Sequence, residues 1–159
     1  MPVNAIPLVE FSNEACSVNE TALTWLSGIS GTLSVVVCAG KYRSGKSFLM
    51  NNLVQETNGH GFGVGGSTQA CTRGLWIYPH AFPSSSGPGS TAADYVVFID
   101  SEGIGALEVE DGHDVRIFAL SVLLSSMFCY NCTSHLDESA FQTLHLMTQV
   151  ANSLSSETN

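Results

Sequence analysis

The stretch G-K-Y-R-S-G-K-S occupies residues 40–47 and directly follows the apolar run 33–39. Two glycines separated by four residues and followed by Lys-Ser form the P-loop pattern, which binds phosphate when a buried strand precedes it. The glycines let backbone N–H groups curl around an anion, and a helix beginning near Gly45 adds its positive N-terminal end. We therefore expect Lys46 to contact the terminal phosphates of a nucleotide and Ser47 to hold a magnesium ion.

Composition limits the class of protein. The 159 residues are 44% hydrophobic and 12% charged, which excludes a disordered tail and allows one domain with a core. The net charge of −9 argues against nucleic acid as the main partner, because duplex binding requires a basic surface. Lys41, Arg43 and Lys46, three of the five basic residues, lie within the P-loop. This concentration of positive charge indicates one site for a small anion.

The sequence shows no signal for export or membrane insertion. Residues 1–11 lack the basic start of a signal peptide, and the apolar-rich stretch 117–128 is too short to span a bilayer. The five cysteines are an odd number without the spacing of a disulfide framework, so we expect a cytoplasmic protein with free thiols. Cys129 and Cys132 form a C-x-x-C pair, which we interpret as strand-end thiols, with zinc or redox chemistry as the alternative.

Alternating strand and helix patterns predict an α/β protein. The apolar patterns predict an edge strand at 6–11, further strands at 33–39, 75–78, 95–99 and 125–130, and helices at 18–29, 115–124 and 137–152, with one more helix that begins near Gly45 and passes through Leu53. Ser17-Val18-Asn19-Glu20 matches the capping box that begins a helix, and the compositions of 58–74 and 82–92 predict loops.

These elements predict a P-loop NTPase fold with a mostly parallel central sheet and helices on both faces. We find no internal repeat and no second domain. Residues 1–159 are therefore expected to form one domain, with an N-terminal strand and helix in 1–32 and the phosphate-binding core in 33–159.

Asp100 is the second candidate for the phosphate site. It ends the apolar run 95–99, and an acidic residue at the end of a neighbouring buried strand commonly completes the magnesium site of a P-loop protein. Gly103 follows it and offers a backbone N–H to the terminal phosphate. An Asp at a strand end can also cap a helix or a turn, but the P-loop upstream favours the metal role.

The Ser/Thr/Gly-rich segment 65–74 lies between these two motifs and predicts a loop that closes over the terminal phosphate. Thr72 is our candidate for its magnesium ligand, because Arg73-Gly74 and a strand follow it directly. Thr68 is the alternative ligand. A third interpretation is that the segment 65–74 is an ordinary surface loop.

The order of these motifs resembles the N-terminal part of the large GTPase domain of guanylate-binding proteins and atlastins, within the dynamin-like superfamily. The matching stretches are 40–51, 71–76, 100–105 and 117–131, and the likeness extends from about Pro7 onward. The resemblance implies a hydrolase that acts on the γ-phosphate of GTP with Mg²⁺ as cofactor.

The resemblance also implies a role for each matched residue. Ser47 and Thr72 would ligate magnesium, and Asp100 would hold the ion through water. Arg43 would act as an internal arginine finger, although its own chemistry fits a solvated loop charge equally well. Glu102 would help to position the attacking water. The implied catalytic set is Arg43, Lys46, Thr72 and Glu102, and the implied nucleotide-binding set is Gly40, Tyr42, Arg43, Ser44, Gly45, Lys46, Ser47, Phe48, Thr72, Asp100 and Gly103.

Two departures from the family pattern leave alternatives open. Ala70 stands where many animal members have a Ser that orients the attacking water, and the chain contains no Arg-Asp pair to read guanine. We therefore expect a G domain truncated before its base-recognition strand, with GTP or GDP as ligand and a second G domain as partner through the nucleotide face. The alternatives are a catalytically inactive nucleotide-binding or interaction module and an ATP-using P-loop enzyme.

Overall fold

The computed structural model describes residues 4–12, 15–55, 60–64, 74–84, 94–104 and 112–133, together with scattered residues between 141 and 153. Within these ranges, seven strands form one sheet in the order β2-β1-β4-β6-β3-β7, and β5 pairs with β6. The strands are β1 (Ile6–Ser12), β2 (Ala15–Val18), β3 (Thr32–Gly40), β4 (Leu75–Ile77), β5 (Phe82–Ser84), β6 (Asp94–Ser101) and β7 (Met127–Asn131). The helices are α1 (Glu20–Ser27), α2 (Lys46–Leu53) and α3 (His113–Leu124).

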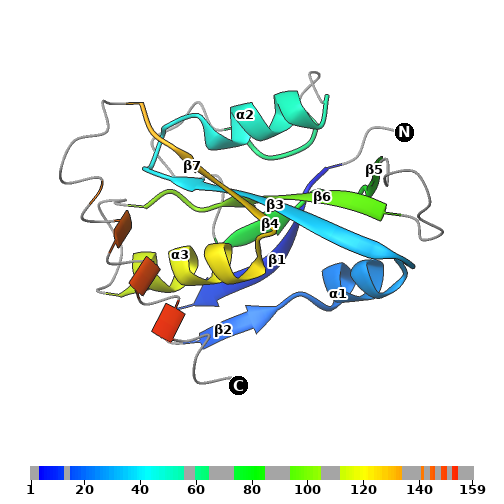
Figure 1. The fold of residues 1–159 in the computed structure, drawn as a ribbon, viewed down its shortest axis with the longest axis horizontal. Coiled ribbons are helices and arrows are strands. Elements are labelled where there is room, and N and C mark those ends of the chain that lie inside the picture. Colours follow the sequence, from blue (N-terminus) through cyan, green and yellow to red (C-terminus); the bar gives the residue numbers. More distant parts are fainter. Residues whose placement is uncertain are drawn as a thin grey trace.

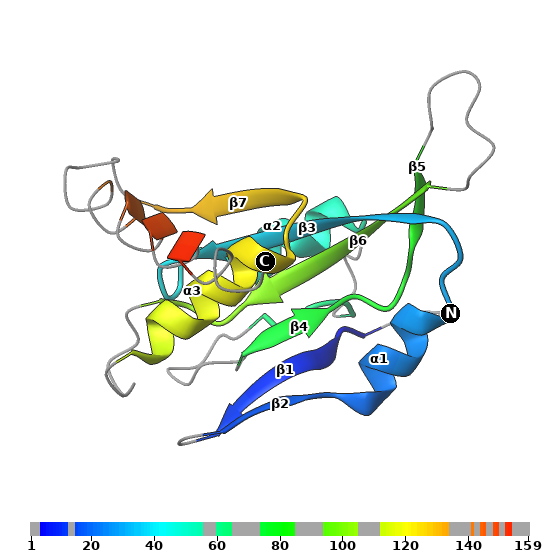
Figure 2. The same cartoon turned by 60° about the horizontal axis from the view of Figure 1, so that its bottom comes forward.

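The layers agree with an α/β architecture. Figure 1 shows α2 on one face of the sheet and α1 and α3 on the other. The arrowheads of β3, β6 and β7 point to the same end of the molecule in Figure 2, and the P-loop joins β3 to α2 at that end. In the described part of the chain, no helix combines the length and the hydropathy that a membrane span requires.

The sheet is mixed, which corrects the expectation of a mostly parallel one. β3 runs parallel to β6 and β7, whereas the pairs β1–β2, β1–β4, β4–β6 and β5–β6 are antiparallel. β1 is also not an edge strand, because it lies between β2 and β4. Only two residues separate β1 from β2, too few for the crossover that a parallel pair requires. The P-loop half of the sheet is thus parallel and the N-terminal half antiparallel.

Strand pairing overrides the local helix signal at the start of α1. The capping box predicted a helix from Val18, but Ser17 and Val18 belong to β2 and pair with β1. Asn19 is the N-cap instead, and its Oδ1 accepts hydrogen bonds from the N–H groups of Thr21 (3.0 Å) and Ala22 (3.2 Å). The antiparallel partner uses the backbone of residues 15–18, so the helix begins only at Glu20.

The other predicted elements agree with the structure within two residues at each end. The exception is β5, which lies at the start of a segment expected to be a loop and pairs with the beginning of β6. Most of the predicted helix 137–152 lies outside the described residues, and Phe141, Leu144 and Thr148 within it are helical.

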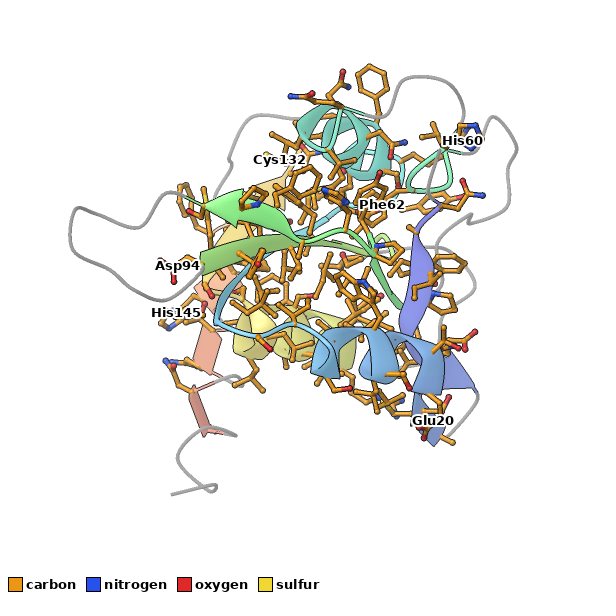
Figure 3. The ribbon with its side chains drawn as sticks, turned by 90° about the vertical axis from the view of Figure 1, so that its right-hand side faces the viewer. Glu20, His60, Phe62, Asp94, Cys132 and His145 are labelled. Atoms are coloured by element: carbon orange, nitrogen blue, oxygen red, sulfur yellow. The ribbon has the colours of Figure 1, made fainter. Side chains whose placement is uncertain are left out.

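Each face of the sheet has its own apolar core, because successive strand residues point to opposite sides. Val37 of β3 is fully buried in the cluster beneath α1 and α3, which also contains Ile117. The next residue, Cys38, is fully buried in the cluster beneath α2, together with Met50 and Phe62. Figure 3 shows Phe62 between α2 and the sheet. This second core fixes α2 above the carboxyl ends of β3 and β6.

Candidate nucleotide phosphate site

The P-loop backbone joins β3 to α2 through a left-handed residue. Gly45 has a φ of 85° and is the N-cap of α2, a conformation that favours glycine over residues with a Cβ. Gly45 has no side chain with which to cap this helix, in contrast to Asn19 at the start of α1. The N-cap residue thus leaves the first N–H groups of α2 to another acceptor, such as the anion that the sequence pattern predicts.

Lys46 is buried at the first position of α2. Its side chain is only 6% exposed, and its Nζ donates a hydrogen bond to the carbonyl oxygen of Lys41 at 3.0 Å. Burial lowers the pKa of the ammonium group from its ordinary value, while the negative charges of Asp100 and Glu102 act in the opposite direction. The cation thus bonds to the backbone of its own loop, within electrostatic range of the carboxylates of Asp100 and Glu102.

Ser47 and Asp100 are 53 positions apart in the chain but meet in the structure. The Oγ of Ser47 donates a hydrogen bond to Oδ2 of Asp100 at 2.5 Å. The Asp100 side chain is completely buried, and within the described part of the chain its Oδ1 has no hydrogen-bond partner. Burial raises the pKa of this carboxyl to about 6, against the bond from Ser47 and the charge of Lys46.

These two residues fit a magnesium ion. Mg²⁺ prefers hard oxygen ligands, and it is usually held in nucleotide sites by one or two protein groups together with water and phosphate. A hydroxyl and a buried carboxylate with one unpartnered oxygen supply such a donor set.

Residues 102–104 run along the P-loop. The N–H of Tyr42 donates to the carbonyl of Ile104 (2.9 Å), and the N–H of Ile104 donates to the carbonyl of Gly40 (3.0 Å). A Cβ at Gly103 would collide with the backbone of Tyr42, so this close approach requires glycine. The structure therefore brings Gly103 against the P-loop.

Within the described part of the chain, the Glu102 carboxylate contacts two other residues of the protein. Its Oε2 accepts a hydrogen bond from the N–H of Gly74 (2.9 Å) and lies 3.1 Å from Nε2 of His113. The N–H of Glu102 in turn donates to the carbonyl of Gly74 (2.8 Å). The carboxylate thus connects the residue that precedes β4 with the first residue of α3.

The remaining predicted residues differ in their exposure. Arg43 is exposed and has a φ of 56°, a left-handed conformation that costs a non-glycine residue about 1 kcal/mol or more. Phe48 is 64% exposed on α2. Thr72, the alternative Thr68 and Ala70 all lie outside the described residues.

Comparison with known proteins shows the family of this chain. Human guanylate-binding protein 5 is 40% identical over 148 residues, which are 92% of this chain and 24% of that protein. Human guanylate-binding protein 4 is 42% identical over 147 residues, with 92% of this chain and 22% of that protein covered. Guanylate-binding protein 1 of Chlorocebus aethiops is 37% identical over 153 residues, with 96% and 25% covered.

The family model for the N-terminal domain of guanylate-binding proteins matches residues 13–159. The chain belongs to the guanylate-binding protein family. It spans about a quarter of the length of the curated relatives that it matches. The resemblance on which the sequence-based assignment depends is therefore confirmed at the level of the family.

In this family member, the interpretation of Cys129 and Cys132 as strand-end thiols agrees with the place of Cys132, whereas Cys129 is the middle residue of β7 and Cys71 lies outside the described residues. Cys129 lies in β7 beside Cys38 of β3, and Cys132 follows the same strand. Both are free, as are Cys16 and Cys38. Among the described residues, no group of three or more His, Cys, Asp and Glu side chains could hold a metal ion.

Sequence reasoning missed two residues near the site, because each acts through a contact between distant segments. His113 contacts Glu102, and Asn131 contacts Ser44 in the P-loop. The sequence signals for Asn131 were its position just after the predicted strand 125–130 and its place at the end of the family-like stretch 117–131. His113 carried no signal beyond its place near a helix start.

Proposed function

We propose that this chain binds GTP or GDP through the P-loop and hydrolyses GTP with the help of Mg²⁺. The hydrogen bond between Ser47 and Asp100 carries the proposal, because it joins the residue after the P-loop lysine to the acidic end of a neighbouring parallel strand. Membership of the guanylate-binding protein family supports guanine nucleotides as the ligands. We further propose that residues 1–159 act as one domain with the phosphate-binding core in 33–159.

The described residues divide between binding and orientation. The backbone from Gly40 to Phe48 surrounds the phosphates, and Lys46 exchanges its bond to the Lys41 carbonyl for the terminal phosphates. Ser47 and Thr72 would hold Mg²⁺, and Asp100 would hold it through water. When bound, the ion neutralises charge that develops on the phosphate oxygens.

The reaction is in-line attack of water on the γ-phosphorus. A bond forms from the water oxygen to the γ-phosphorus, and the bond from that phosphorus to the β–γ bridging oxygen breaks, which yields GDP, inorganic phosphate and a proton. Gly103, held against the P-loop, offers its N–H to the γ-phosphate, and Arg43 neutralises the transferring group. Glu102 fixes Gly74 and thereby the end of the segment that carries Thr72.

The test is GTP hydrolysis by the 159-residue chain with and without Mg²⁺. Lys46→Ala should abolish both nucleotide binding and turnover, whereas Arg116→Ala, which removes an exposed charge from α3 outside the P-loop, should retain both. Parallel titrations with GTP, ATP and inorganic triphosphate measure how much of the affinity comes from the base. A wild-type chain that binds none of the three would contradict the proposal.

A nucleotide-binding module without turnover is the second candidate, and Ala70 favours it. Many animal members of the family have a Ser at this position, and its hydroxyl can orient a water molecule. Alanine has no hydroxyl and cannot do so. Such a module would pair with a second G domain through the nucleotide face. Ala70→Ser distinguishes the two candidates, because it should raise turnover of a slow enzyme and leave an inactive module unchanged.

A further inference from the structure

Asn131 ends β7 beside the P-loop. Its Nδ2 donates a hydrogen bond to the carbonyl oxygen of Ser44 at 2.8 Å and lies 3.4 Å from the Ser44 Oγ. Ser44 is only 8% exposed and immediately precedes Gly45, the N-cap of α2. A side chain from the neighbouring strand therefore holds the last part of the loop before the helix begins.

The backbone of Asn131 contacts the other end of the same loop. Gly40 pairs with Asn131 in the register of β3 and β7, and a Cβ at Gly40 would collide with the carbonyl of Asn131. One residue of β7 thus touches the loop at its first glycine and at Ser44. Because the two contacts are made by different atoms of one residue, they fix the loop at both ends relative to the sheet.

We propose that Asn131 is a positioning residue for phosphate binding. Its amide fixes the Ser44 carbonyl and, through the same peptide unit, the direction of the Gly45 N–H. The inference rests on the proposed function, because it assigns a role within the same P-loop. Asparagine suits the role since its amide donates, whereas an aspartate of the same shape accepts only and would repel the Ser44 carbonyl.

The proposal predicts a particular pattern of affinities. P-loop N–H groups cradle the α- and β-phosphates, which GDP and GTP share. Loss of the Asn131 contact should therefore weaken both nucleotides by the same factor. A contact with the γ-phosphate would instead change the affinity for GTP alone, and a purely structural contact would change the stability of the free protein without changing either affinity.

The test is titration of the 159-residue chain with Mg·GDP and with a non-hydrolysable GTP analogue. Asn131→Ala should weaken both ligands by roughly three- to tenfold, the range of one neutral hydrogen bond, and Asn131→Asp should weaken both further. In turnover assays, KM should rise while kcat stays unchanged, because the lost interaction is made equally in the ground and transition states.

Asn52→Ala is the matched control. Asn52 also donates through Nδ2 to a backbone carbonyl, that of Phe48 at 2.8 Å, but it is exposed on α2. Its removal should change both affinities by less than about twofold, within the range of an ordinary surface substitution. The melting temperature of each ligand-free variant is measured alongside.

Three results would overturn the proposal for a chain that binds nucleotide. These are unchanged affinities in both Asn131 variants, a loss confined to the GTP analogue, or a loss as large in Asn52→Ala. If both Asn131 variants are unfolded, Asn131→Ser replaces them, because its shorter side chain removes the contact with less change in polarity; wild-type affinity would then overturn the proposal. A wild-type chain that binds neither nucleotide contradicts the proposed function itself.

Discussion

At the scale of single residues, the site is built around a charge that is costly without a ligand. Asp100 is completely buried, one carboxylate oxygen accepts from Ser47, and the other has no partner within the described residues. Burial of a carboxylate that is only partly hydrogen-bonded opposes folding, and a bound cation relieves that cost. The buried position of Asp100 is therefore explained better by a role in ligand binding than by a contribution to stability.

Asp100→Asn should therefore separate stability from binding. The amide keeps an acceptor for Ser47 and removes the buried charge, so we expect the ligand-free protein to gain about 1–3 kcal/mol in free energy of unfolding. Mg²⁺-dependent nucleotide binding should fall by at least about tenfold. Urea denaturation without ligand and titration with Mg·GDP measure the two effects. Lower stability in the variant would show that the buried charge is already compensated within the protein.

Arg43 allows a second residue-scale prediction. Its side chain is exposed and its backbone is left-handed, so the residue is accessible to a bound nucleotide and equally compatible with a solvated loop charge. Arg43→Ala should lower kcat by about 10³–10⁵ if the residue acts as an arginine finger, with little change in GDP affinity. Arg116→Ala, which removes an exposed arginine from α3, is the control and should keep wild-type turnover. Equal kcat in both variants would leave Arg43 as a solvated loop charge.

At the scale of elements, the two helices that follow β2 and β3 begin in different ways. α1 is capped by the Asn19 side chain, which uses two of its first N–H groups within the protein. α2 begins at Gly45 without a side-chain cap. A helix that serves only the fold satisfies its own terminus, whereas a helix at a phosphate site leaves that terminus to the ligand.

The cap of α1 provides a test at this scale. Asn19→Ala should lower the free energy of unfolding by about 0.5–2 kcal/mol, because two N–H groups lose their acceptor. Ser17→Ala is the matched control, since the sequence pattern named Ser17 as the cap but the structure places it in the exposed strand β2. Its effect should stay within about 0.5 kcal/mol. Thermal and urea unfolding of both variants compare them, and a larger effect at Ser17 would favour the sequence-based cap.

At the scale of the whole molecule, one sheet separates two apolar cores that support different helices. The core beneath α1 and α3 includes Val37 and Ile117, and the core beneath α2 includes Cys38 and Met50. Of these two cores, the second contains Met50 of α2, the helix whose N-terminus we propose as part of the phosphate site. Stability therefore depends on both faces, whereas the geometry of the site depends chiefly on one.

Met50→Ala and Ile117→Ala test this division. Each removes a fully buried apolar side chain and should cost about 2–5 kcal/mol in free energy of unfolding. Met50→Ala should also weaken Mg·GDP binding, because it loosens α2, whereas Ile117→Ala should leave the affinity within about threefold. Met50→Val and Ile117→Val replace any variant that is unfolded at the assay temperature. Equal losses of affinity from both faces would refute the division.

The sequence by itself determined the features that depend on neighbouring residues. The β-branched run before Gly40 predicted β3, the glycine spacing predicted the P-loop, and the apolar spacing near Phe118 predicted α3. The same local patterns carried the resemblance to the guanylate-binding protein family, which the comparisons confirm. Each of these depends on side-chain type and on spacings of a few residues, so one sequence is sufficient to predict them.

The tertiary structure alone decided what depends on strand order and register. It made the N-terminal half of the sheet antiparallel and drew Ser17 into β2. It also brought Ser47 to Asp100 across 53 positions and Asn131 to Ser44 across 87. A hydrogen bond requires donor and acceptor within about 3 Å, and no local pattern specifies which distant strand will supply the partner. The P-loop pattern can therefore be predicted from neighbouring residues alone. The residues that contact the loop from outside, Asp100 and Asn131, come from β6 and β7, and only the strand order of the sheet places these strands beside β3.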